Sequence, residues 1–261
     1  MIVHEFGDKK NPVIMLFPGT MCYWKGNFGG VIDELAKKFL VAAVAYTGFD
    51  DNDTESYTSV DDELEKIERY INASYGGKIC AAYGCSLGGS FVAHLAARHN
   101  VHMQYGIIGS SDIDQAGKVK AGIMAAIMVK VTYNFIHTGK YKSALMQKRF
   151  TKQMADPDPY NRAFVTLTGR DKYDMSFITK ASLKNQFRSD LTTPLPEQID
   201  NGETEIHVFY AKKMGEKYLE RYNKYFKHPI IHAQDMRTRN CSAFIRRIGA
   251  HLLNRSACNK T

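Results

Sequence analysis

The chain has 261 residues, of which 44% are hydrophobic and 24% are charged, and its formal net charge is +8. This length is enough for one large domain with a buried core, and the composition is ordinary for a globular protein. No run of about 18 uninterrupted apolar residues occurs, so the sequence predicts no membrane-spanning helix.

The basic residues are concentrated in the second half of the chain. Residues 1–112 hold 9 Lys and Arg against 14 Asp and Glu, whereas residues 113–261 hold 26 against 13. Such an asymmetry fits either an anionic partner or a basic surface in solvent. We favour the solvated surface, and we expect no nucleic-acid partner, because no basic run with interleaved aromatic residues is present.

The cysteines and the first residues favour the cytoplasm. Five cysteines at irregular spacing fit reduced thiols better than a disulfide framework, and no pair has the spacing of a metal site. Residues 1–6 lack the basic and then apolar pattern of a signal peptide. The sequence therefore predicts a cytoplasmic protein without a metal ion. It contains no nucleotide or flavin motif, so we expect no cofactor.

Strands and helices alternate along the first 109 residues. Apolar runs predict strands, and apolar residues that recur at i, i+3 and i+4 predict helices. In chain order the predicted elements are a strand over 13–17, a helix over 28–36, a strand over 39–45, a helix over 61–71, a strand over 78–83, a helix over 90–98 and a strand over 103–109. This alternation is typical of α/β proteins, with a mostly parallel central sheet and helices on both faces.

The motif Gly84-Cys85-Ser86-Leu87-Gly88 joins one of these strands to the following helix. A strand, Gly-x-Ser-x-Gly and a helix form a nucleophile elbow, in which small neighbours let strand and helix approach closely. The turn exposes the serine hydroxyl, and the free N–H groups at the start of the helix point to the same place. The flanking strand and helix favour an elbow over a chance turn.

Three segments follow predicted strands whose carboxyl ends meet at one rim of the sheet. They are the loop that begins with Pro18-Gly19, the motif residue Ser86, and Asp112. In open α/β sheets, ligands bind beyond the carboxyl ends of the strands. The sequence therefore predicts a binding site that these three segments share.

The order of strand, Pro-Gly loop, helix, strand, acidic loop, helix and Gly-Cys-Ser-Leu-Gly elbow resembles the α/β-hydrolase superfamily. The resemblance covers residues 11–112 well and resumes more loosely at 204–253. It implies a triad in the chain order Ser, acid, His, together with an oxyanion hole. One N–H of that hole is implied to come from Leu87, and the other from Thr20 or Met21.

Residues 113–200 do not continue the alternation. Residues 119–135 predict one long Met-rich helix, and Pro-rich passages follow it. The resemblance implies that 113–200 is a helical cap on a core made of residues 1–112 and 201–261. Apolar side chains of the long helix would either line an acyl pocket or pack the cap against the sheet, and both roles stay open.

The last part of the chain returns to strands and helices. The predicted elements are a strand over 205–210, a helix over 218–226, a strand over 229–233 and a closing helix over 243–253. The resemblance implies that this part supplies the remaining triad residues.

The acid and the histidine are the weakest part of the predicted triad. Glu216 follows the penultimate strand, while Asp112 or Asp114 follows the preceding strand of the sheet; either kind of acid can orient an imidazole. His232 is the candidate base, although it falls within the last predicted strand, and His207 is a lesser candidate. The loop after the last strand has no histidine, His228 precedes that strand, and His251 lies on the closing helix, too far along the chain from the expected position.

Two functions follow from this pattern. The first is a serine hydrolase acting on a small ester, thioester or lactone: Ser86 attacks, His232 takes its proton, and Glu216 or Asp112 orients the imidazole. The second is a protein that keeps the fold but lacks a base, and that binds or regulates. Cys85 is a third nucleophile of little weight, because the residue before the elbow serine normally points away from the pocket.

Overall fold

The computed structural model describes residues 1–109, 111, 113, 115–155 and 166–235. Its centre is a sheet of seven strands in the order β1-β3-β2-β4-β5-β6-β7. The strands are β1 (Ile2–Phe6), β2 (Val13–Phe17), β3 (Leu40–Ala45), β4 (Lys78–Cys85), β5 (His102–Gly109), β6 (Glu205–Ala211) and β7 (Ile230–Gln234). Every neighbouring pair is parallel except β1 with β3. The predicted mostly parallel sheet is confirmed.

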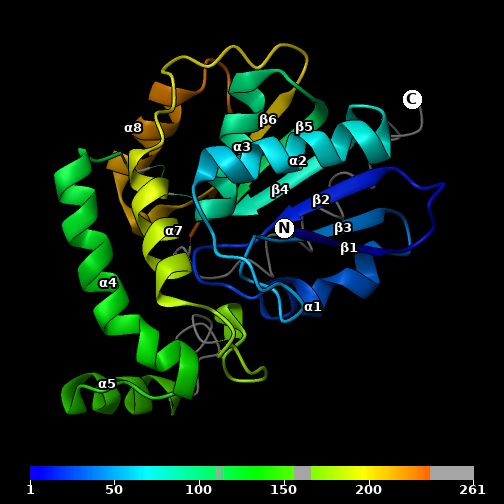
Figure 1. The fold of residues 1–261 in the computed structure, drawn as a ribbon. Helices are drawn as coiled ribbons and strands as arrows, with labels where there is room; N and C mark the ends of the chain where they lie inside the picture. The colour runs from blue at the N-terminus through cyan, green and yellow to red at the C-terminus, as the bar shows by residue number, and fades with distance from the viewer. Residues whose placement is uncertain (110, 112, 114, 156–165, 236–261) are drawn as a thin grey trace.

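Helices cover both faces of this sheet. The helices of the described chain are α1 (Trp24–Leu35), α2 (Val60–Tyr75), α3 (Leu87–Arg98), α4 (Lys118–Thr138), α5 (Ala144–Met154), α7 (Lys180–Thr192) and α8 (Glu216–Tyr225), with a 3-10 turn at Lys212–Met214. Figure 1 shows α2 and α3 in front of the strands. All six residues of β3 are buried, which is possible only where both faces of a strand are covered.

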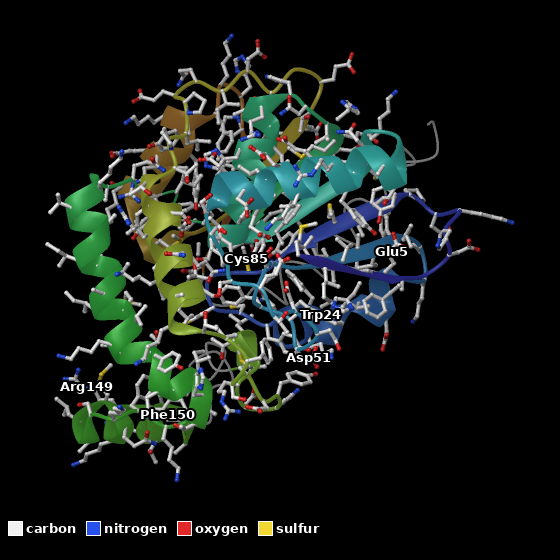
Figure 2. All side chains as sticks on the ribbon, viewed as in Figure 1. Glu5, Trp24, Asp51, Cys85, Arg149 and Phe150 are labelled. Atoms are coloured by element: carbon white, nitrogen blue, oxygen red, sulfur yellow. The ribbon has the colours of Figure 1, made fainter. Side chains whose placement is uncertain are left out.

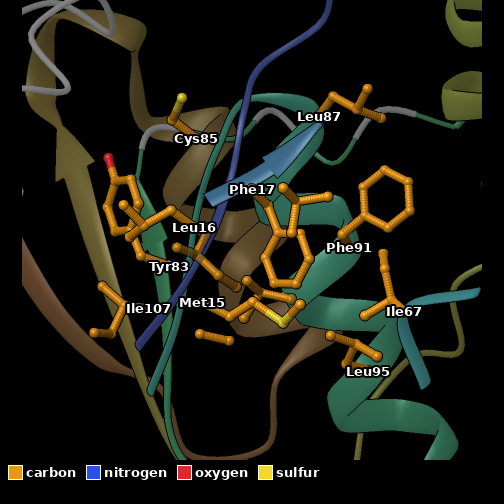
Figure 3. Close-up of a cluster of buried hydrophobic side chains, with 14 of the residues drawn as sticks. Met15, Leu16, Phe17, Ile67, Tyr83, Cys85, Leu87, Phe91, Leu95 and Ile107 are labelled. Atoms are coloured by element: carbon orange, nitrogen blue, oxygen red, sulfur yellow. The ribbon is translucent and has the colours of Figure 1, made fainter. Parts of the chain in front are cut away.

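The core lies between the central strands and α3. Met15, Leu16 and Phe17 of β2 are fully buried, and the Phe17 ring stacks on Phe91 of α3 with centroids 6.1 Å apart. Figure 3 shows this cluster. The ring of Tyr46 also stacks on Phe91, with centroids 4.8 Å apart. The packing fixes α3 against the ends of β2 and β4, and thereby fixes the turn between β4 and α3.

The sequence pattern did not predict the first strand. Strand β1 mixes apolar and polar residues without alternation, and all five are only half-buried, as expected of a strand at the edge of a sheet. It pairs antiparallel with β3, with Ile2 opposite Ala45. A short edge strand carries no continuous apolar run, so the criterion that found the buried strands misses it.

The helices α4, α5 and α7 lie between β5 and β6 in the chain, within the segment predicted to be a cap. Figure 1 shows α4 at the edge of the molecule, with α7 between it and the sheet. In the described part of the chain, α4 is long and apolar enough to cross a membrane by length and composition. The sequence criterion passed over it because Lys120 and Lys130 interrupt its apolar run. One face of α4 is nevertheless packed within the protein, through Ala121, Ala125 and Phe135.

The cysteines differ from the expectation. Cys80 in β4 is disulfide-bonded, whereas Cys22 and Cys85 keep buried thiols. The prediction of reduced thiols throughout is therefore wrong at Cys80. Because disulfides persist in oxidising compartments and are rare in the cytosol, this bond weighs against the predicted cytoplasmic location.

Alkylation is expected to separate these cysteines. In denaturant without reductant, iodoacetamide should modify Cys22 and Cys85 but not Cys80, because only a thiolate reacts with it. Reduction before alkylation should add the reagent to Cys80 as well, and peptide mass spectrometry reads all three positions. Modification of Cys80 in the unreduced sample would show that the disulfide is absent and would restore the original expectation.

Candidate active site

Ser86 occupies the tight turn between β4 and α3. Its backbone has φ 51° and ψ −121°, a conformation that a residue with a Cβ adopts only when the surrounding packing enforces it. The Ser86 side chain is exposed, although Cys85 before it and Leu87 after it are buried. The turn therefore presents a single hydroxyl at the surface of an otherwise closed structure, as the elbow prediction requires.

The glycines of the motif are there because no side chain fits beside this turn. A Cβ on Gly84 would lie 1.9 Å from the carbonyl oxygen of Gly88, and a Cβ on Gly88 would lie 2.1 Å from the carbonyl oxygen of Phe17. Both distances are far shorter than van der Waals contact. The backbones of strand β4, the start of α3 and the end of β2 are therefore in direct contact. This contact leaves no room inside the structure for the Ser86 side chain, which lies at the surface.

The loop after β2 lies directly beside Ser86. A Cβ on Gly19 would be 3.6 Å from the Ser86 Cβ. The hydroxyl of Tyr46 donates to the Pro18 carbonyl at 3.0 Å, and burial raises the pKa of Tyr46, so this donor stays protonated. The structure thus brings the Pro-Gly loop and the elbow together at the rim, as predicted.

The amides of this loop differ in what they bind. The Gly19 N–H donates to Asn27 Oδ1 at 2.9 Å, and the Met21 N–H donates to Gln186 Oε1 at 2.7 Å. Within the described residues, the N–H groups of Thr20 and Leu87 have no acceptor. Two backbone donors therefore remain for a developing oxyanion, and of the two loop candidates Thr20 is the one whose amide is not already engaged.

Cys85 points away from this rim. Its side chain is 3% exposed, and its Sγ lies 3.5 Å from Asn27 Oδ1 below the loop. Figure 2 places Cys85 in the interior of the molecule. The neighbouring Cys22 thiol is also buried, and burial raises its pKa well above the usual value. Neither sulfur is placed to attack a substrate at the surface, which agrees with the low weight given to Cys85.

The structure does not bring His232 to Ser86. Strand β7 continues to Gln234, so His232 remains within the sheet, in register with Phe209 of β6, Gly109 of β5 and Cys85 of β4. Three strand spacings separate His232 from Cys85, about 14 Å in all. A general base must come within about 3 Å of the hydroxyl whose proton it takes.

The ring of His232 is engaged where it is. It stacks on Phe209 at 4.5 Å, and its Nε2 lies 2.9 Å from Nδ1 of His207. His207 is itself buried, and its Nε2 lies 2.6 Å from Glu205 Oε1. The three side chains form a carboxylate–imidazole–imidazole chain along the outer strands. This arrangement holds both candidate histidines away from the elbow.

The predicted acids are only partly visible. Glu216 is exposed and forms the first residue of α8, just beyond the end of β6. A carboxylate at that position is favourable for the helix dipole alone. Asp112 and Asp114 lie outside the described residues. The structure therefore places Glu216 at the predicted turn after β6 without a histidine beside it in the described part of the chain.

Residues of α7 reach the site, and the sequence did not predict them. Gln186 holds the Met21 amide, and Asp190 Oδ1 accepts from Ser90 Oγ at 3.2 Å, one helical turn beyond Ser86. Both side chains cross more than 90 positions of sequence to make these contacts. No helix over 180–192 was predicted from the sequence, and polar residues on such a helix would not by themselves reveal which loop they reach.

No protein-family model matches the sequence, and no curated protein matches it. Solved structures are similar over nearly their whole length. A protein of the alpha/beta hydrolase family from Desulfitobacterium hafniense has TM-score 0.73 at 17% identity, covering 97% of this chain and 99% of that one. The enol-lactonase from Burkholderia xenovorans LB400 has TM-score 0.68 at 12% identity, over 97% and 95%. The type II thioesterase BorB from the borrelidin biosynthetic cluster has TM-score 0.62 at 13% identity, over 97% and 96%.

Proposed function

Because the chain has the α/β-hydrolase fold, we propose that it is a hydrolase that cleaves a small ester, thioester or lactone with Ser86 as the nucleophile. The observation that carries this proposal is the exposed Ser86 side chain at φ 51°, set between buried neighbours at the start of α3. A strained, exposed serine at a helix N-terminus is the arrangement that acyl transfer needs.

The chemistry follows from the groups at the rim. The Ser86 oxygen bonds to the substrate carbonyl carbon while the carbonyl oxygen takes up negative charge. The amides of Leu87 and Thr20 would donate to that oxygen, and the positive end of the α3 dipole favours it further. The alcohol or thiol then leaves with a proton, and water releases the acid from Ser86. The proton of Ser86 must pass to a base other than His232, to which the sequence pattern assigned this role with Glu216 or Asp112 orienting it, because His232 lies three strands from Cys85.

A second function has its own support. His232 is bonded to His207 and stacked on Phe209 within the sheet, and that placement favours a protein that keeps the fold without a working base. Such a protein would bind an acyl compound beside Ser86 without turning it over. The fold alone does not separate the two functions.

A fluorophosphonate probe separates them. In the hydrolase, the probe should label the wild-type protein at Ser86, because the activated oxygen attacks its phosphorus, and Ser86→Ala should remove the label. Ser176→Ala is the matched control, since Ser176 is also exposed, and it should leave labelling unchanged. Peptide mass spectrometry locates the adduct. A wild-type protein that stays unlabelled while a control hydrolase in the same tube is labelled would support the binding protein instead.

A further inference from the structure

Most of the large exposed apolar side chains that the structure describes belong to two consecutive helices. Among the described residues, seven large hydrophobic side chains are exposed, and six of them belong to α4 and α5. These six are Val119, Ile123, Met124, Ile127, Met128 and Leu145. Single exposed hydrophobic residues are normal, but a gathered set of this kind marks an interaction surface.

The same segment is strongly basic. Residues 118–154 contain eight Lys and Arg and no Asp or Glu. The eight are Lys118, Lys120, Lys130, Lys140, Lys142, Lys148, Arg149 and Lys152. This is as large as the net charge of the whole chain, +8. We call the exposed side chains of α4 and α5 the basic apolar face.

The helix spacing makes the apolar part of this face continuous along α4. Val119, Ile123 and Ile127 follow one another at intervals of four, so they lie along one side of α4. The side toward α7 is formed by buried residues, including Ala121 and Ala125. The apolar stripe therefore belongs to the outer side of a helix that is already packed on its inner side.

The end of α4 and the start of α5 are held together rigidly. The ring of Phe135 in α4 stacks on Tyr141 at 4.8 Å and meets Phe150 of α5 at 5.2 Å. Figure 2 shows Arg149 and Phe150 at the far side of the molecule from Glu5. The basic apolar face is thus a preformed surface, located away from the edge strand β1.

We propose that the basic apolar face docks on an anionic lipid bilayer, with α4 lying along the membrane surface. Apolar side chains between basic ones suit the boundary between acyl chains and anionic headgroups, and Lys stems can extend toward the headgroups while their methylenes remain in the apolar layer. The face needs both an apolar layer for its hydrophobic side chains and negative charge for its basic ones. Water provides neither, and an acidic protein surface without an apolar layer provides only the charge.

Charge argues against the other occupants. Two copies joined through this face would bring eight positive charges against eight. The segment 236–261 carries six Lys and Arg and no acid, so it does not complement the face either. An anionic bilayer satisfies both the charge and the apolar stripe. The proposal uses no residue of the elbow, and it stands or falls separately from the hydrolase.

Vesicle binding tests the proposal in the Ser86→Ala protein, so that catalysis plays no part. Cosedimentation with phosphatidylcholine vesicles containing about a third phosphatidylserine should be roughly tenfold stronger than with phosphatidylcholine alone, and it should weaken with added salt. Lys120→Glu with Lys130→Glu should weaken binding ~10-fold or more, because each basic residue near the surface contributes to the attraction. Ile127→Ser should weaken it as well, through loss of apolar insertion.

Matched controls come from the rest of the molecule. Ile230→Ser removes the one exposed large hydrophobic side chain that the described residues place outside the face, and Lys9→Glu with Lys37→Glu makes the same charge change elsewhere. Both should bind like the parent, and thermal melts should show that all variants are folded. Equal binding to both vesicle types, or no binding at all, would overturn the proposal. Ile127→Ser could also leave vesicle binding unchanged and lower the sedimentation coefficient of the protein measured without lipid. That result would overturn the proposal as well, since the basic apolar face would then join copies of the chain.

Discussion

Replacing Ser86 by alanine is expected to lower kcat/KM on p-nitrophenyl butyrate about 10³-fold or more. The hydroxyl is the only group that the elbow exposes, and its removal eliminates the acyl-enzyme altogether. Binding and the Leu87 and Thr20 amides remain, so a residual rate above that of water is expected. Initial rates at several substrate concentrations, with active protein measured by absorbance and thermal melting, give the ratio.

The same assay on His232→Ala shows whether His232 accepts the proton of Ser86. His232 lies in β7, about 14 Å from the strand end that carries Ser86 at the usual strand spacing. The variant should therefore keep its activity within about twofold of the wild type, whereas loss of a triad base would lower the activity ~10³-fold or more. A large loss in His232→Ala would mean that the last strand rearranges in solution to bring the imidazole to Ser86. Unchanged activity in Ser86→Ala would instead remove Ser86 from the chemistry.

Gly88→Ala is expected to destabilise the protein by about 3 kcal/mol or more. The added methyl group would lie 2.1 Å from the Phe17 carbonyl oxygen. The Cβ position is fixed by the backbone of residue 88 and the oxygen belongs to the backbone of Phe17, so no side-chain rotation can relieve the clash. The start of α3 must therefore move away from β2, which breaks the packing that holds the elbow.

Gly122→Ala is the matched control for this effect. Gly122 is also inside a helix, but nothing lies within 4 Å of the position where its Cβ would be. Alanine there should stabilise the protein by about 0.5–1 kcal/mol, through helix propensity. Urea unfolding of both variants measures the two changes. Equal midpoints for Gly88→Ala and the wild type would show that α3 does not approach β2 as closely as described.

The central strands and the elbow were predictable because each depends on local sequence. Continuous apolar runs such as residues 13–17 and 39–45 have few alternatives to a strand covered on both faces. Gly84 and Gly88 could be identified because a serine turn of this type needs small residues at fixed offsets. In these segments the local preference and the tertiary structure require the same residues, so a single sequence is sufficient to predict the strands and the elbow.

The partners of Ser86 could not be predicted in the same way, because they depend on where separate elements end and meet. His232 would have been a reasonable base if β7 had ended before it; the strand runs to Gln234, and the ring stays in the sheet. Strand ends are set by pairing with a neighbour, which a single sequence does not record. Gln186 and Asp190 reach the rim only because α7 packs where it does.

The basic half of the chain shows a similar limit. The count of charges over residues 113–261 favours a solvated surface, since it gives no reason for basic residues to gather beside apolar ones. The structure places Lys120 and Lys130 on the same helix as exposed Ile123 and Ile127. The distinction between a merely basic surface and one suited to a partner thus depends on which side of α4 is buried.

The hydrogen bond between Gln186 and the Met21 amide has a consequence for shortening the protein. Deleting the inserted helices would leave a buried donor without its acceptor, at about 1–3 kcal/mol, in the loop that lies beside Ser86. A truncated protein made only of the sheet and its flanking helices would therefore lose a contact that fixes this loop, even though no residue of the loop had been changed.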